Sequence, residues 1–88
     1  MRPIISKHAK KRLKQRLGLK RKSHIRHIQK VLEKGILQYR DIEENILYIW
    51  YDYRRYIFED LNGLEAILIT VFPKEKNYHN PINPIQKS

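Results

Sequence analysis

The sequence predicts an α+β domain in which two N-terminal helices pack on a three- to four-stranded antiparallel sheet. Apolar residues recur every three or four positions within the first 34 residues, as they do on one face of a helix. After residue 36 the chain becomes rich in Ile, Tyr, Val and Phe, which suit the pleated surface of a sheet. With 88 residues there is length for one domain, which we assign to 1–80, followed by a flexible C-terminal tail over 81–88.

The first helix is expected over residues 7–17. Ser6 can cap it by accepting a hydrogen bond from a backbone N–H, and Gly18 can end it in the left-handed conformation. Spacing of four residues then aligns an apolar stripe of Ala9, Leu13 and Leu17.

The second helix is expected to begin at a Ser23 cap and to end at Gly35. Its wider apolar face consists of Ile25, Ile28, Val31 and Leu32. Because the linker between the helices is short, they should form an antiparallel or steeply crossed hairpin.

The strand region is expected to form a meander that closes at Pro73, which cannot donate to a ladder. Asn62-Gly63 favours a hairpin turn, whereas "YDYR" is a weaker turn signal, so residues 46–60 are either two strands or one bent strand. "IIS" or "LQYR" would add an edge strand. The favoured strands are 46–51, 54–60 and 64–72.

Positive charge is concentrated at one end of the chain. The net charge is +10, and residues 1–34 hold thirteen Lys or Arg against the single acid Glu33. Such a one-sided field favours a nucleic-acid partner, RNA before DNA. An anionic membrane surface is the rival partner, but it requires large apolar residues opposite the lysines, and here those stripes are small.

Two further features restrict the class of protein. No apolar run reaches the roughly 20 residues of a membrane-spanning helix, and the N-terminus lacks the hydrophobic segment of a secretion signal. The absence of cysteine excludes disulfides and cysteine-based zinc sites. A cytoplasmic protein is therefore expected.

Three side chains of the first helix form one ridge beside its apolar stripe. His8, Arg12 and Arg16 are spaced by four residues. A histidine that moves a proton and guanidinium groups that stabilise a charged phosphate are the components of a metal-independent ribonuclease. The alternative is a solvated polar face with no chemistry.

Histidines of the second helix suggest a metal only weakly. His24 and His27 are three residues apart, but no third ligand has an obvious position. We expect His24 to be a partly buried residue of the capping turn, and we predict no metal and no cofactor.

Aromatic residues surround the arginines of the second strand. Alternation along one strand would place Tyr51, Tyr53 and Arg55 on one face and Trp50, Arg54 and Tyr56 on the other. The exposed set would hold single-stranded bases by stacking. Alternatively, these rings only cover the sheet.

Further polar groups follow near the C-terminal end. Thr70 can bond a phosphate or a ribose, and Tyr78 and His79 of the tail can reach the same groove or remain surface residues.

Two segments resemble a known family. "ISKHAKKRLKQRLGLKRKSHIRHIQKVLEKG" and "YRRYIFEDLNGLEAILITVFP" resemble small phage- and plasmid-associated toxin-type proteins that open with a His-Ala-x-x-Arg helix. These are RelE/ParE-like proteins, within the group sharing the barnase/EndoU/colicin/RelE-like fold. The likeness covers residues 4–73 and implies a RelE-like fold.

The resemblance also implies an activity. Such proteins are typically metal-independent endoribonucleases that cleave single-stranded or ribosome-bound RNA and are neutralised by an acidic antitoxin. The family's residues fall here on His8, Arg12, Arg16, Arg55 (with Arg54 as the other choice) and Thr70. Its C-terminal His/Arg/Tyr cluster is reduced to Tyr78 and His79, which leaves open a relative that binds RNA without cutting it.

Three functions therefore remain open: a ribonuclease, a non-catalytic nucleic-acid-binding regulator, and a basic module that docks an acidic protein. Beside the catalytic set, the residues expected to bind nucleic acid are Lys7, Lys11, Lys20, Arg21, Lys22, Arg26, Arg54, Tyr53, Tyr78 and His79.

Overall fold

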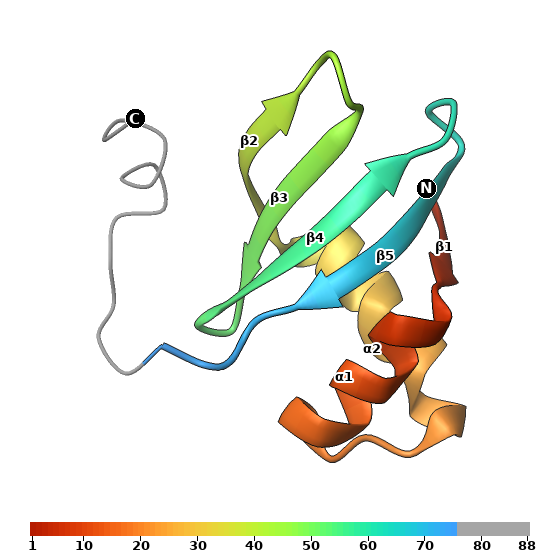
Figure 1. Ribbon diagram of the computed structural model, residues 1–88, viewed down its shortest axis with the longest axis vertical. Coiled ribbons are helices and arrows are strands. Elements are labelled where there is room, and N and C mark those ends of the chain that lie inside the picture. Colours follow the sequence, from red (N-terminus) through yellow and green to blue (C-terminus); the bar gives the residue numbers. More distant parts are fainter. Residues whose placement is uncertain (76–88) are drawn as a thin grey trace.

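Seven elements follow one another in the computed structural model, which describes residues 1–75. The predicted tail over 81–88 lies outside these residues. A short strand precedes the two helices, and four strands follow them (Figure 1). The elements are β1 Arg2–Ile5, α1 Lys7–Leu17, α2 Arg21–Lys34, β2 Ile36–Asp41, β3 Ile46–Tyr51, β4 Arg54–Asp60 and β5 Glu65–Val71.

The predicted sheet of three or four antiparallel strands is wrong. The sheet has five strands in the order β1-β5-β4-β3-β2, and it is mixed. β1 runs parallel to β5, with Ile4 opposite Ile67, whereas the other neighbours are antiparallel. The fold therefore begins with a strand at the sheet edge and not with a helix packed on a completed meander.

Both segments named as possible edge strands do lie in edge strands, since "IIS" overlaps β1 and "LQYR" lies in β2. What was not predicted is the parallel partner of β1, because a strand of four residues is too short to show a period. Its place is fixed by distant partners: Arg2 forms an ion pair with Glu65, and the backbone N–H of Ser6 donates to the carbonyl of Leu68. Parallel pairing also needs a crossover connection, which α1 to β4 supply as a whole. None of this can be read from local composition.

The ends of α1 are as predicted. The Ser6 hydroxyl accepts from the N–H of Ala9 at 3.1 Å, and Gly18 takes the left-handed conformation with φ 67°. α2 differs: it begins at Arg21 after the N-cap residue Lys20, which forms no side-chain cap bond, so Ser23 lies inside the helix.

Gly35 ends α2, but not through a left-handed conformation, since its φ is −69°. A Cβ atom at this position would overlap the side chain of Ile49 and the carbonyl oxygen of Val31. Glycine is therefore required for the close approach of the chain to β3, which places α2 directly beneath the sheet.

A two-residue turn decides between the alternatives left open for 46–60. Asp52 and Tyr53 both have positive φ, of 50° and 64°, which produces a tight hairpin between two strands. Trp50 then pairs with Arg55. The face assignment made for a continuous strand was therefore wrong, because Trp50 and Arg55 share one face of the sheet while Tyr56 lies on the other.

The core lies between the helices and one face of the sheet (Figure 1). Ala9 and Leu13 of α1 and Ile28 and Val31 of α2 are fully buried there. The sheet contributes Ile5, Leu47, Ile49, Tyr56, Phe58, Ala66, Leu68 and Val71.

Candidate nucleic-acid interface

The two helices carry cations that have no carboxylate partner in residues 1–75. The segment from Lys7 to Lys34 contains twelve Lys or Arg and one acid, Glu33, whose carboxylate accepts from Gln29. Four ion pairs are found among residues 1–75, and all of them lie outside the helices, in the sheet region. The helical charges are thus left to face solvent or an external anion.

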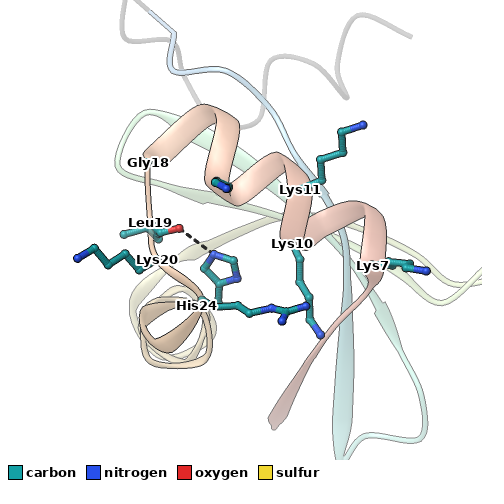
Figure 2. A pocket seen from close by; sticks show the side chains of 9 residues that line it. Lys7, Lys10, Lys11, Gly18, Leu19, Lys20 and His24 are labelled. Carbon is teal, nitrogen blue, oxygen red and sulfur yellow. Dashed lines mark hydrogen bonds between the residues drawn. The ribbon is translucent and has the colours of Figure 1, made fainter.

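A groove lies where α1 passes the beginning of α2 (Figure 2). Its volume is about 610 Å³, and it is lined by six cations, one histidine and no acid. The backbone turn at Gly18 and Leu19 closes one end. The cations are Lys7, Lys10, Lys11 and Lys14 from α1 and Lys20 and Arg21 from the start of α2.

The local sequence explains why α1 turns lysines toward this groove. Ala9 and Leu13 fix the buried side of the helix. Lys10 and Lys14 follow each by one position and are therefore rotated about 100° from it, on the α2 side. Figure 2 shows Lys10 extending from α1 toward the gap between the two helices.

The other side of α1 carries the predicted catalytic ridge. The Arg12 Nε donates to His8 Nε2 at 3.3 Å, so this ring nitrogen acts as an acceptor. Gln15 accepts a second bond from Arg12. Two of the three ridge residues thus contact each other directly.

Arg16, the third residue of the ridge, lies beside an arginine of β4. Arg54 donates to the carbonyl of Arg16 at 3.1 Å, which ties the C-terminus of α1 to the sheet. The Nε atoms of both arginines are buried and have no hydrogen-bond partner in the described part of the chain. Arg16 and Arg54 therefore bring spare donors to one place.

Arg55 and Thr70 lie apart from this ridge. Thr70 pairs with Ile57, and Ile57 alternates with Tyr56 and Phe58, which point into the core. Arg55 follows the same alternation onto the face away from the helices. The five predicted catalytic residues are consequently divided between two sides of the sheet, with His8, Arg12 and Arg16 on the helical side.

Arg55 already has several protein partners. It donates to Gln38 at 3.1 Å, forms an ion pair with Glu75 at 3.2 Å, and lies over the ring of Trp50. Tyr53 is part of the β3–β4 turn, with Lys74 above its ring. These contacts organise the uncovered face of the sheet around aromatic rings.

The two histidines of α2 have separate partners. His24 is 4% exposed, and its Nε2 lies 3.1 Å from the carbonyl oxygen of Leu19. His27 Nε2 lies 2.8 Å from the hydroxyl of Tyr56. Burial lowers the pKa of His27, and Asp52 partly opposes this effect. Burial also raises the pKa of Tyr56.

The remaining predicted binding residues divide into three groups. Lys7, Lys11, Lys20 and Arg21 line the groove, whereas Lys22 and Arg26 are exposed on α2 outside it. Tyr78 and His79 lie outside the described residues. The predicted binding set lacked Lys10 and Lys14, although their four-residue spacing was a signal that could have found them. It also lacked His24, which was expected only as a partly buried residue of the capping turn.

Within residues 1–75 no three metal-ligating side chains gather in one place. No helix in that range is long and apolar enough to cross a membrane. Comparisons of the chain with protein-family models, with curated proteins and with solved structures found no match. Function has to be inferred from the groove and the residues around it.

Proposed function

We propose that the protein binds RNA, and that phosphate groups of the RNA occupy the groove between α1 and α2. One observation carries this proposal: six cations surround a concave surface that no carboxylate lines. When these side chains neutralise RNA phosphates, the cations condensed on the RNA are released to solvent, which favours binding. Exposed lysines also supply several rotatable donors that adapt to a flexible strand.

An acidic protein, such as an antitoxin, would be attracted to the same charges. RNA fits the groove better because it supplies one negative charge at each nucleotide and a single strand can follow the curved surface. An acidic protein would compete with RNA for Lys10 and Lys14, so competition identifies such a partner without changing the proposed site.

The test is fluorescence anisotropy of a labelled single-stranded RNA titrated with protein at several salt concentrations, with EDTA present. We expect affinity to fall steeply with salt. The double variant Lys10→Gln/Lys14→Gln should bind the RNA roughly 10-fold more weakly. The slope of log affinity against log salt concentration should become shallower by about 1.4, since each phosphate contact on a single strand contributes about 0.7.

A matched control changes one charge on the sheet side of the molecule. Lys74 lies 3.8 Å from Asp52 and does not line the groove, so Lys74→Gln should leave RNA affinity nearly unchanged. Binding that is absent, or that does not depend on salt, would contradict the proposal.

The ridge on the other side of α1 favours a second function, that of a metal-independent endoribonuclease. Contact between Arg12 and His8 holds the imidazole ring. Arg16, eight residues after His8 on the same ridge, contacts Arg54, and the Nε atoms of both have no hydrogen-bond partner among residues 1–75. In this reaction the 2′-oxygen attacks phosphorus and the 5′-oxygen leaves, which gives a 2′,3′-cyclic phosphate and a 5′-hydroxyl. His8 would transfer a proton, and the arginines would stabilise the charge on the phosphate.

Cleavage is tested by incubating the same RNA, and ribosome-bound message, with protein in EDTA. The wild type should produce cyclic-phosphate ends, and His8→Ala should lose about 10²- to 10⁴-fold in rate while it keeps its RNA affinity. Equal cleavage by both proteins would remove His8 from the mechanism. Binding without cleavage of either substrate would leave RNA binding as the function.

A further inference from the structure

The beginning of α2 lacks the cap that the beginning of α1 possesses. Ser6 caps α1 with its hydroxyl, whereas Lys20 at the start of α2 forms no side-chain bond. No acidic residue occupies the first turn of α2. The free N–H groups and the helix dipole therefore give this end a positive potential, in the same groove that Lys20 and Arg21 line.

A buried and unpaired nitrogen lies in the wall of this groove. His24 is 4% exposed, and its Nδ1 has no hydrogen-bond partner among residues 1–75. The carbonyl of Leu19 can only accept, so Nε2 must carry the proton that it donates. In the neutral ring Nδ1 is consequently a hydrogen-bond acceptor, in a groove that is otherwise lined by cationic donors.

The chemistry of this acceptor limits what it can bind. Phosphodiester oxygens accept hydrogen bonds but cannot donate one. The 2′-hydroxyl of ribose is the group of the RNA backbone that donates, and deoxyribose lacks it. An acceptor beside an anion site thus suits a ribose next to its phosphate.

We propose that the groove is a ribose-phosphate subsite that distinguishes RNA from DNA. The phosphate lies at the uncapped N-terminus of α2, near Lys20 and Lys10, and the adjacent 2′-hydroxyl donates to His24 Nδ1. Nδ1 is buried, so this contact requires the exposed lysine side chains around the groove, whose stems are flexible, to move aside. This subsite rests on the proposed RNA-binding function and specifies its substrate class.

The experiment compares three labelled single strands of one sequence, with ribose, 2′-fluoro or 2′-deoxy sugars. The 2′-fluoro group cannot donate a hydrogen bond. We expect the wild type to bind the ribose strand about 2- to 10-fold more tightly than either of the others, the range of one neutral hydrogen bond.

His24→Gln sharpens the test because its amide nitrogen can still donate to the Leu19 carbonyl, while no acceptor remains at the position of Nδ1. Its preference for ribose should fall to about one, with affinity for the deoxy strand retained. Lys30→Gln is the control: it changes an exposed charge of the same helix outside the groove and should preserve the ribose preference. Thermal unfolding of both variants checks that each is folded.

The outcomes separate the subsite from the function on which it rests. Equal, salt-sensitive binding of all three strands by the wild type would overturn the subsite and leave nucleic-acid binding intact. A ribose preference that His24→Gln retains would also overturn it. Failure of every strand to bind would overturn both proposals.

Discussion

The helical layer and the sheet contain the same kinds of charged side chain but use them differently. In the sheet Arg2, Arg40 and Arg55 each form an ion pair with a carboxylate. In the helices the cations from Lys7 to Lys34 form none with the carboxylates of residues 1–75.

This difference separates charges that hold the fold from charges that are available to a ligand. Asp60 illustrates the first kind: it accepts from the backbone N–H groups of Gly63 and Asn62 and from Arg40, and these bonds lower its pKa. Lys10 illustrates the second kind, since it is exposed and lines the groove. Substitutions should therefore affect folding in one layer and binding in the other.

The largest effect is expected from the core that joins the layers. Phe58 is fully buried, so Phe58→Ala should lower the free energy of unfolding by about 3–5 kcal/mol. Phe72, which is 43% exposed, is the matched control, and its replacement by Ala should cost less than half as much. Urea titration monitored by circular dichroism measures both, and similar losses would contradict the described core.

Charge reversal in the groove should change binding without changing stability. We expect Lys10→Glu/Lys14→Glu to weaken RNA binding by about 30- to 100-fold, because the groove loses two cations and gains two repulsive charges. The free energy of unfolding should change by less than about 0.5 kcal/mol per site, as for other exposed positions. Anisotropy and urea titration on the same samples provide the two values.

Asp60→Asn is the opposite case and completes this comparison. It weakens the bonds to Arg40 and to the β4–β5 turn, so the urea midpoint should fall while RNA affinity stays unchanged. If RNA affinity and stability fell together both in Asp60→Asn and in Lys10→Glu/Lys14→Glu, the two layers would not be separable.

The buried contact between α2 and β4 should have a smaller effect. Tyr56→Phe removes the hydroxyl that lies 2.8 Å from His27 Nε2, which should cost about 1 kcal/mol. His27→Phe/Tyr56→Phe tests the pair, since replacing both partners should cost less than the sum of the single changes. Additive losses would indicate that the two groups do not interact.

The smallest effect is a dependence of stability on pH. Burial, the main cause, lowers the pKa of His27 below 6.5, and Lys30 and Arg54 add to the effect against the opposing influence of Asp52. Below 6.5 the unfolded chain therefore binds a proton that the folded chain does not, and stability falls as the pH falls. His27→Gln should reduce the loss of urea midpoint between about pH 7.5 and 5.5. An unchanged loss would contradict this assignment.

Local signals in the sequence were sufficient for several elements. Ser6 and Gly18 marked both ends of α1, and Asn62-Gly63 marked the turn before β5. These features depend on residues close in the chain, for which side-chain capping and backbone conformation decide the structure.

Long-range contacts determined what the sequence could not show. The parallel pairing of Arg2–Ile5 with β5 joins the two ends of the described chain. The groove likewise depends on how α1 crosses the start of α2, which places Lys10 and Lys14 near His24. The composition of the sequence located the positive half of the chain, but it did not show on which side of α1 the groove forms.

Titration of isotopically labelled protein with a short single-stranded RNA, followed by backbone amide NMR spectra, tests the central claim most directly. We predict that the largest chemical-shift changes occur at Lys7–Lys14 and Leu19–His24, around the groove, with little change at Tyr39 and Tyr48 on the uncovered face of the sheet. Changes concentrated on that aromatic face, with α1 and the start of α2 unaffected, would contradict the account.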